Sequence, residues 1–289
     1  MKGAINRIEL ERHILAWLEE DMPFGDVTTD ALLDETIVGS GALIAKESGV
    51  LCGIEIFEMI YECIDKNVKI DKKKSDGMNI ESGDVIGEIS GPIASILKGE
   101  RLGLNIMQRL SGIASKSQIY AEAVKQYDTK IVDTRKTTPG LRSLEKYAVR
   151  IGGCTNHRYS LSDAVMIKDN HIAGAGSITE AVRRVKACIP HTAKIEVEVE
   201  TFNELREVIH TGVDIILLDN MTTEQLRRAV RFVKEHAKKA ISLEASGNMT
   251  LERLPEVAAT GVDIISVGAL THSVNALDIS LKFEKPVVK

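Results

Sequence analysis

The chain has 289 residues, of which 44% are apolar and 27% charged, a balance typical of a globular protein that can bury a core. The formal net charge of −5 argues against a nucleic-acid binder, so any site for an anionic ligand must be a local basic cluster. There is no run of about 18 apolar residues that could span a membrane, and Glu9, Glu11 and Arg12 interrupt any signal peptide.

We therefore expect a cytoplasmic protein that is not bound to a membrane. The four cysteines lie far apart and contain no CxxC pair (Cys52, Cys63, Cys154 and Cys188). This spacing predicts reduced thiols, with no disulfide and no zinc site.

The first third of the chain predicts an α+β domain. Residues 5–20 predict an amphipathic helix, with Ile5, Ile8, Leu15 and Leu18 on a helical period. Short β-rich runs follow at 41–45, 68–70 and 85–89, with a predicted helix at 53–63 between the first two. A long helical segment then extends from about residue 93 to 127. This order predicts a small antiparallel sheet with helices packed on it.

Beyond residue 128, short β-branched runs alternate regularly with helical stretches. The β-runs are 130–133, 164–167, 194–199, 213–218, 241–243 and 262–267, and the helical stretches are 141–151, 178–188, 202–210, 223–236 and 251–260. The hexapeptide TGVDII occurs twice, at 211–216 and 260–265. Such a repeat predicts a parallel sheet, either doubly wound or closed as a barrel. The repetition favours the barrel, although periodicity alone leaves the open sheet possible.

Polar residues follow each of these β-runs, where a parallel α/β barrel builds its active site. One group is basic and suits carboxylates or phosphates: Arg135, Lys136, His157, Arg158 and Lys168. Glu198 and Asp219 are an acidic pair that could hold hydrated Mg²⁺ or sugar hydroxyls. A third group could bind phosphate through backbone N–H groups: Ser246, Gly247, Asn248 and Gly268. Together they predict a phosphorylated sugar and an anionic second substrate.

Each feature also has a purely structural interpretation. An Arg-Lys pair beside a strand is usually solvated, and a single histidine such as His157 is more often a hydrogen-bonded structural residue. Cys154 is expected to be a small packed residue. Glu196, Glu198 and Glu200 share one face of a strand, and at most two of the three could act in catalysis. No single motif decides the function.

Several longer segments resemble the quinolinate phosphoribosyltransferases, in the order of that family and over nearly the whole chain. The most specific is DTRKTTPGLR at 133–142, and FGDVTT at 24–29 is similar to the family's entry segment. The others are GERLGLN at 99–105, QRLSGIA at 108–114, NHR at 156–158, IKDNH at 167–171, EVEVE at 196–200, LLDN at 217–220, EASG at 244–247 and SVGALTH at 266–272.

The resemblance implies an α/β fold with two domains. An N-terminal open-faced α/β sandwich would comprise residues 1–112, with the tail 273–289 packing back on it. Residues 113–272 would form an incompletely closed α/β barrel that carries catalysis. The resemblance also implies a homodimer with shared active sites, in which Arg101 of one subunit enters the site of the other, and leaves open whether dimers assemble further.

The implied reaction transfers phosphoribosyl from phosphoribosyl pyrophosphate to quinolinate, with loss of carbon dioxide. It yields nicotinate mononucleotide and pyrophosphate for NAD biosynthesis. Besides the partner's Arg101, the residues implied for quinolinate are Arg135, His157, Arg158 and Lys168. Lys136, Glu198 and Asp219 would serve the pyrophosphate donor and Mg²⁺, and Ser246, Gly247 and Gly268 the 5′-phosphate. Cys154 stands where the family usually has a third glycine.

Three other functions remain open on the sequence. A sister phosphoribosyltransferase could use nicotinate, but the excess of cationic residues favours two carboxylates over one. A paralogue of the same fold, found beside molybdate-transport genes, is the second. A non-catalytic barrel that senses a phosphorylated ligand is the third, and the presence of both Glu198 and Asp219 argues against it.

Overall fold

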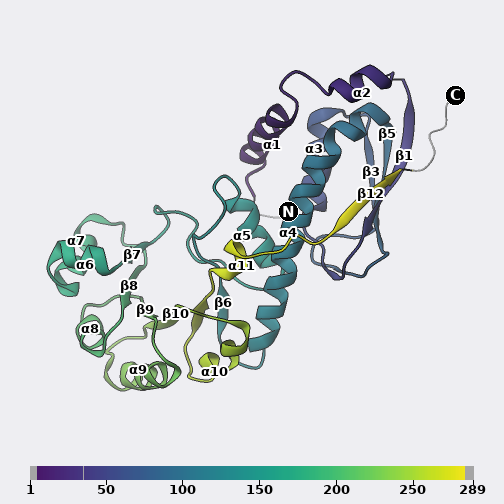
Figure 1. Ribbon diagram of the computed structural model, residues 1–289. Coiled ribbons are helices and arrows are strands. Elements are labelled where there is room, and N and C mark those ends of the chain that lie inside the picture. The colour runs from purple at the N-terminus through teal and green to yellow at the C-terminus, as the bar shows by residue number, and fades with distance from the viewer. Residues whose placement is uncertain (1–4, 35, 284–289) are drawn as a thin grey trace. The chain divides into compact units, whose positions relative to one another are not determined.

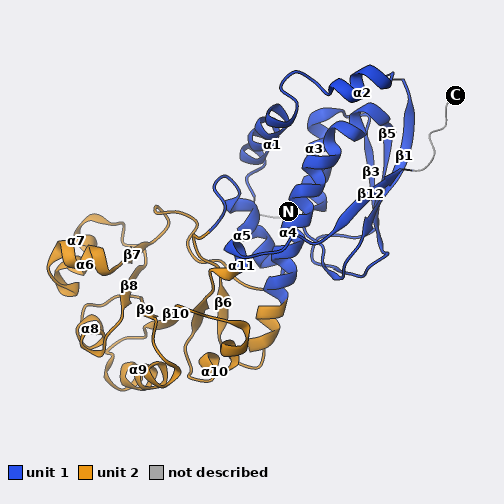
Figure 2. Cartoon of the chain, viewed as in Figure 1, with its two compact units in different colours: residues 1–118, 137–153, 270–289 blue, residues 119–136, 154–269 orange. Residues whose placement is uncertain are grey.

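The computed structural model describes residues 5–34 and 36–283. Its contacts divide the chain into two compact units (Figure 2). The first comprises 1–118, 137–153 and 270–289, and the second comprises 119–136 and 154–269. The domain boundaries expected from the sequence stay a prediction, because the compact units divide the chain at more than one point.

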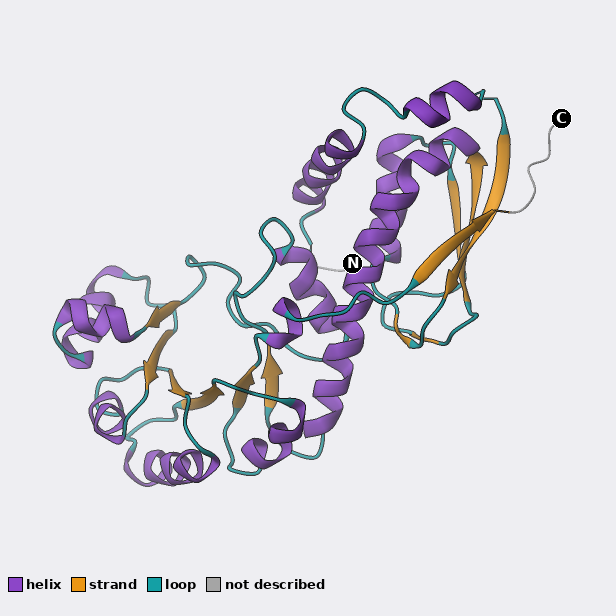
Figure 3. Cartoon of the chain, viewed as in Figure 1, coloured by secondary structure: helices purple, strands orange, loops and turns teal. Residues whose placement is uncertain are grey.

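The first unit is built on an antiparallel sheet, drawn in orange at the upper right of Figure 3. Its four strands have the order β12-β1-β5-β3. Its strands are β1 (Val38–Ala45), β3 (Lys69–Lys72), β5 (Val85–Pro92) and β12 (Ile279–Phe283). Strand β12 pairs with β1 from Ile279 opposite Ala45 to Phe283 opposite Gly41. The end of the described chain therefore completes a sheet that begins near its start. Strands β2 (Gly49–Val50) and β4 (Asn79–Ile80) pair with each other in a separate two-stranded antiparallel sheet.

The first unit also contains several helices, and two of them, α3 and α4, pack in one core with the sheet. The helices are α1 (Arg7–Asp21), α2 (Val27–Leu32), α3 (Ile54–Ile64), the first part of α4 (Ile93–Val124) and α5 (Arg142–Ile151), while α11 (Ala269–His272) begins at the unit boundary. Phe57 and Tyr61 of α3 pack in one cluster with Leu43 of β1, Ile89 of β5 and Ile96 of α4. These five residues are all buried, and they join two strands and two helices in one core.

The predicted N-terminal helix is confirmed, and Leu18 of the residues named on its helical period is buried, whereas Ile8 and Leu15 are not. Helix α1 buries Leu10, Ile14 and Leu18, which follow one another every fourth residue and share one stripe. Ile8 is 72% exposed and Leu15 is 50% exposed. Those two residues are seven positions apart and lie together on another side of the helix. Two stripes with a helical period were present in the sequence, and the tertiary fold decided which one is buried.

The second unit is a sheet of six parallel strands in the order β6-β11-β10-β9-β8-β7. They are β6 (Lys130–Val132), β7 (Val165–Ile167), β8 (Ile195–Val199), β9 (Ile215–Asp219), β10 (Ser242–Ser246) and β11 (Ile264–Ser266). Figure 1 shows the strands arranged in an arc with the helices on its outer side. Among the described residues no pairing joins β6 to β7, so the sheet stays open between these two strands. The predicted α/β architecture is confirmed, while full closure of the barrel is not observed.

The helices of the second unit are the end of α4, α6 (Asp169–Ala175), α7 (Ile178–Cys188), α8 (Phe202–Val208), α9 (Thr223–His236) and α10 (Leu254–Ala258), with a 3₁₀ turn at Leu251–Arg253. Helices α7, α8 and α9 begin with a serine or threonine cap, at Ser177, Thr201 and Thr222. These caps explain where three of the predicted helices start. No helix of the described chain is long and apolar enough to cross a membrane.

The repeated hexapeptide makes the same turn twice. The hydroxyls of Thr211 and Thr260 each donate a hydrogen bond to the backbone carbonyl three residues earlier, at 2.7 and 2.6 Å. Gly212 and Gly261 follow with positive φ angles of 71° and 87°, a conformation that glycine adopts without steric cost. The threonine and glycine thus end a helix and turn the chain into the next strand.

The aspartate of each repeat ties that strand to its neighbour. The carboxylate of Asp214 accepts a hydrogen bond from the backbone N–H of Ile195 at 2.9 Å, and Asp263 accepts one from Leu243 at 2.7 Å. Each bond joins two adjacent parallel strands at their N-terminal ends. The repeat therefore fixes the register at the N-terminal ends of these strands. The polar residues that follow the strands lie at the opposite, C-terminal ends.

Candidate active site

A pocket of about 420 Å³ lies at the C-terminal ends of the parallel strands in the second unit. Residues from all six strand ends line it, directly or through the loops that follow them. Its lining residues are Thr134, Arg135, Lys136, His157, Arg158, Met166, Lys168, Glu198, Leu217, Asp219, Glu244, Ser246 and Ser266. The structure thus brings together most of the basic and acidic residues that the sequence singled out.

A buried aspartate holds the two loops that carry the basic residues. Asp133, at the end of β6, is fully buried. Its carboxylate accepts hydrogen bonds from the side-chain amide of Asn156 at 2.6 Å and from the backbone N–H of His157 at 2.9 Å. The segment that starts with Arg135 and the segment that contains Arg158 are therefore anchored to one carboxylate.

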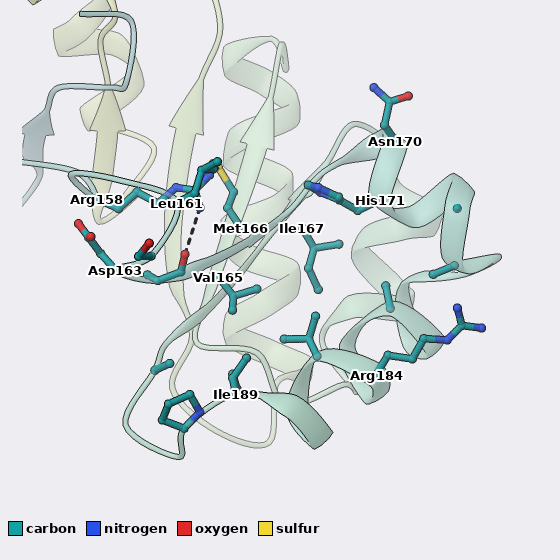
Figure 4. Close-up of a pocket in the computed structure, with 18 residues that line it drawn as sticks. Arg158, Leu161, Asp163, Val165, Met166, Ile167, Asn170, His171, Arg184 and Ile189 are labelled. Atoms are coloured by element: carbon teal, nitrogen blue, oxygen red, sulfur yellow. Dashed lines mark hydrogen bonds between the residues drawn. The ribbon is translucent and has the colours of Figure 1, made fainter. Parts of the chain in front are cut away.

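The guanidinium groups of Arg135 and Arg158 form the cationic side of the pocket. Arg158 donates a hydrogen bond to the backbone carbonyl of Ala164 at 3.0 Å (Figure 4). The Nε atom of Arg135 is buried and has no hydrogen-bond partner among the described residues. Burial, and then the positive charge of Arg135, lower the pKa of Arg158. Two partly buried guanidinium groups that repel one another form a site in which an anion would be stabilised.

Lys168 and Glu198 form an ion pair across the ends of β7 and β8. The Lys168 Nζ atom lies 2.5 Å from a carboxylate oxygen of Glu198. The Glu198 side chain is 11% exposed and that of Lys168 is 44% exposed, so the pair sits at the boundary between pocket and solvent. The sequence assigned these two residues to different ligands and did not predict their contact.

Glu198 also belongs to a group of carboxylates that could hold a cation. Oxygen atoms of Glu198, Glu200 and Asp219 lie within 4.8 Å of one another, with Glu200 exposed to solvent. Carboxylate oxygens are the ligands that Mg²⁺ prefers, often through bound water. The donor set therefore fits the magnesium ion expected from the sequence.

The His157 ring uses both of its nitrogen atoms within the protein. Its Nδ1 atom accepts a hydrogen bond from the backbone N–H of Arg158 at 2.7 Å, so this nitrogen carries no proton. The Nε2 atom lies 3.1 Å from Glu196 and 3.7 Å from Glu244. This network assigns the tautomer with hydrogen on Nε2, donated to a carboxylate. The ring thus links the backbone of the Arg158 segment to these two glutamates.

Sequence reasoning did not assign a role to Glu244, although it lines the pocket. Burial, and then the negative charge of Glu196, raise the pKa of Glu244 to about 7, against the opposing effects of His157 and Ser266. One oxygen of Glu196 and one of Glu244 are buried without a hydrogen-bond partner. The signal in the sequence was a glutamate within an otherwise apolar run, Leu243 to Ala245, on the inward face of β10.

The residues expected at the 5′-phosphate are distributed differently. Ser246 lines the charged pocket, whereas Gly247 and Asn248 line a separate hollow of about 330 Å³ beside Asn220. Arg253, which also lines this hollow, donates hydrogen bonds to the carbonyls of Gly247 at 3.1 Å, Asn248 at 3.5 Å and Met221 at 2.6 Å. Arg253 thus clamps the loops after β9 and β10, a role that the sequence did not indicate.

Two other predicted residues lie outside the pocket lining. Gly268 follows β11 and is not among the lining residues. Arg101 is exposed on α4 and belongs to the first unit.

Cys154 is 5% exposed, and burial raises the pKa of its thiol to about 12. Cys154 is therefore a packed thiol, as expected.

A larger hollow of about 710 Å³ lies beside β7 (Figure 4). It shares Arg158 and Met166 with the charged pocket. Apolar side chains such as Val165, Ile167 and Ile189 make up much of its wall. Since the carboxylates and most of the cations line the smaller pocket, we place the chemistry there.

Comparisons with known proteins point in one direction. The families described as quinolinate phosphoribosyl transferase, N-terminal and C-terminal domain, match residues 26–111 and 113–282. A probable nicotinate-nucleotide pyrophosphorylase [carboxylating] of Bacillus subtilis is 43% identical over 277 residues, covering 96% of this chain and 94% of the relative. The mitochondrial quinolinate phosphoribosyltransferase [decarboxylating] 2b of Nicotiana tabacum is 40% identical, covering 93% and 80%. The crystal structure of NadC from Streptococcus pyogenes superposes with a TM-score of 0.91 at 40% identity, covering 96% and 97%.

Proposed function

Because the chain belongs to the quinolinate phosphoribosyltransferase family, we infer that the pocket at the strand ends is its active site. The enzyme transfers the phosphoribosyl group of phosphoribosyl pyrophosphate to quinolinate with decarboxylation, a step of NAD biosynthesis. The products are nicotinate mononucleotide, pyrophosphate and carbon dioxide. The observation that supports this location is the meeting of two partly buried guanidinium groups with a carboxylate cluster in one pocket.

We propose that the two carboxylates of quinolinate bind on the cationic side of the pocket. Arg135 offers a buried Nε atom without a hydrogen-bond partner. Arg158 lies close enough for the positive charge of Arg135 to lower its pKa. Lys168 would exchange its contact with Glu198 for a substrate carboxylate. His157 would hold the Arg158 backbone in place through its Nδ1 atom. Such positioning can contribute on the order of 7–11 kcal/mol by restricting the freedom of the reactants beforehand.

The donor would bind on the acidic side, through Lys136, Glu198 and Asp219. Glu198 and Asp219, with Glu200 nearby, are the residues that would hold Mg²⁺, directly or through water. When bound, this ion neutralises part of the charge that pyrophosphate carries and gains on leaving. Lys136 is exposed at the rim and would stabilise the departing pyrophosphate electrostatically. The 5′-phosphate would meet Ser246, Gly247, Asn248 and Gly268.

The bond changes follow from this placement. The bond between the anomeric carbon and pyrophosphate breaks, and positive charge develops on the ribose ring. The carboxylates of Glu198 and Asp219 favour that charge. The pyridine nitrogen then forms the new bond to the anomeric carbon. The positively charged nitrogen that results stabilises an electron pair on the adjacent carbon, so the carboxylate there leaves as carbon dioxide and a proton takes its place.

We also propose a homodimer in which Arg101 completes the site of the partner. Arg101 is exposed on α4, and the motif that surrounds it at 99–105 is one of those shared with the family. The cytoplasmic location stays a prediction.

The decisive assay follows pyrophosphate and labelled carbon dioxide together. Purified protein is incubated with Mg²⁺, phosphoribosyl pyrophosphate and either quinolinate or nicotinate. We expect both products from quinolinate and no pyrophosphate from nicotinate, whose single carboxylate would leave one guanidinium group unpaired. Glu198→Gln should lower the rate, while Glu235→Gln on the exposed side of α9 should not. Pyrophosphate from nicotinate alone would assign the protein to the sister transferase.

A further inference from the structure

Two buried glutamates, one of which lines the proposed active site, have no role in the reaction as described above. Glu196 on β8 is 4% exposed, and Glu244 on β10 is 1% exposed. Both point to the inner side of the sheet, where α/β barrels normally place apolar side chains. Carboxylates in such a position destabilise the fold unless they are protonated or paired.

The hydrogen-bond network allows one carboxylate and one neutral carboxyl group. His157 provides one hydrogen atom, on Nε2, and it lies closer to Glu196, at 3.1 Å, than to Glu244, at 3.7 Å. The facing Glu244 oxygen has no hydrogen-bond partner. The groups that act on Glu244 are Glu196 from β8, His157 from the loop after β6, and Ser266 from β11, which bonds its carboxyl group. Because Glu244 is buried and faces the charge of Glu196, its neutral form is favoured.

Glu244 can deliver that proton to a bound molecule because it lines the pocket, whereas Glu196 does not. The other acids of the pocket are used differently. Glu198 is paired with Lys168, Asp219 is partly exposed at the pocket rim, and the His157 hydrogen is donated to Glu196. The guanidinium groups of Arg135 and Arg158 are much weaker acids than a carboxyl group. Glu244 is therefore the buried acid of the pocket that is favoured in its protonated form.

We propose that Glu244 is the catalytic acid that protonates the ring carbon from which carbon dioxide departs. The bond from this carbon to the carboxylate breaks, and its electron pair stays on the carbon beside the positively charged nitrogen. That pair then forms a C–H bond with the Glu244 proton, which leaves a carboxylate. Solvent returns a proton to Glu244 after the product dissociates. Until the ring carbon is protonated, it can react again with the released carbon dioxide. The proton donor, Glu244, therefore controls the net rate of decarboxylation. This role rests on the proposed function.

The pH dependence has a defined direction. Glu244 must be protonated to act, and its pKa is raised to about 7 in the protein. The rate of decarboxylation should therefore be highest below this pH and fall as the pH rises through it. The hydrogen bond from Ser266 lowers the pKa of Glu244. Removing it with Ser266→Ala should move the fall in rate to higher pH.

The test compares the wild-type enzyme, Glu244→Gln and Ser266→Ala in single-turnover reactions with quinolinate labelled in the departing carboxylate. Glutamine keeps the size of glutamate but cannot donate the proton. In Glu244→Gln we expect release of carbon dioxide to slow on the order of 10²-fold while pyrophosphate release persists. The mononucleotide that still carries both carboxylates should then accumulate, and the fall in rate at alkaline pH should be absent.

The outcomes separate the two ideas. If the wild-type enzyme releases neither product from quinolinate, the proposed function is overturned, and this inference with it. If the wild-type enzyme releases both, and Glu244→Gln releases carbon dioxide at the wild-type rate, only the role of Glu244 is overturned. If Glu244→Gln does not fold, Ser266→Ala decides. A fall in rate at the wild-type pH in that variant counts against Glu244, and a fall at higher pH supports it.

Discussion

Replacing Gly247 by alanine tests whether the loop after β10 positions the catalytic residues on the neighbouring strand. Gly247 has a φ angle of 88°. A Cβ atom placed on it would lie 2.1 Å from the side-chain oxygen of Asn220 and 3.0 Å from the backbone nitrogen of Asn220. Asn220 follows Asp219 directly and donates a side-chain hydrogen bond to the Asp219 carboxylate at 2.6 Å. A methyl group here would therefore displace a residue in contact with the proposed active site.

Two terms set the expected loss of stability. A residue with a side chain costs about 1–2 kcal/mol in the left-handed region. Overpacking against the Asn220 backbone adds a further cost of about 1–3 kcal/mol. Displacement of a catalytic group by about 1 Å can lower the reaction rate on the order of 10²-fold. We therefore expect Gly247→Ala to lose both stability and kcat/KM for phosphoribosyl pyrophosphate.

Gly176→Ala is the matched control. Gly176, at the end of α6, has a φ angle of 97°, and a Cβ atom placed on it would meet nothing within 4 Å. It should carry the backbone cost without the overpacking, and its kinetics should stay at the wild-type values. The midpoints of urea unfolding measure the stability of each variant. Initial rates at saturating quinolinate and varied phosphoribosyl pyrophosphate give kcat/KM for the donor. Equal losses of stability and activity in the two variants would refute the reasoning.

Three further predictions concern the ion pairs and the partner subunit. Lys168→Ala should raise KM for quinolinate and lower kcat/KM, because the pocket loses a cation, and an unchanged kcat/KM would remove Lys168 from the substrate site. Mixing Arg101→Ala with Lys168→Ala subunits should restore part of the activity in verified heterodimers, and no recovery would argue against a shared site. Arg109→Met should lower the free energy of unfolding by about 3–5 kcal/mol, because it leaves the fully buried Glu145, now 2.5 Å away, without its counter-ion. Adding Glu145→Leu should recover much of that loss in urea unfolding, and no recovery would contradict the assignment.

Much of the parallel-sheet unit could be predicted from local sequence. The six β-runs after residue 128 correspond to β6 through β11, and the repeated hexapeptide marks two equivalent turns into strands. Helix α2, with 6 residues, and α6, with 7, were missed because such short segments do not reveal a period. Strand β12 was missed because its partner, β1, lies at the other end of the chain. Pairing over such a distance leaves no local signal.

The candidate site shows a similar division. Arg135, Lys168 and Glu198 could be singled out because each stands where a β-run ends. They meet in one pocket because the C-terminal ends of parallel strands all lie on the same side of the sheet. The clamp formed by Arg253 could not be predicted, because its three carbonyl partners lie in two separate loops.

The sequence by itself determined the family, the parallel α/β architecture and the kinds of chemical group that reach the edge of the sheet. Those properties depend on local periodicity and on which residues follow each strand. Only the tertiary structure decided that Lys168 pairs with Glu198, that His157 turns its N–H toward Glu196, and that Glu244 is buried beside them. Protonation depends on distance and desolvation, and both arise only when strands remote in sequence pack against one another.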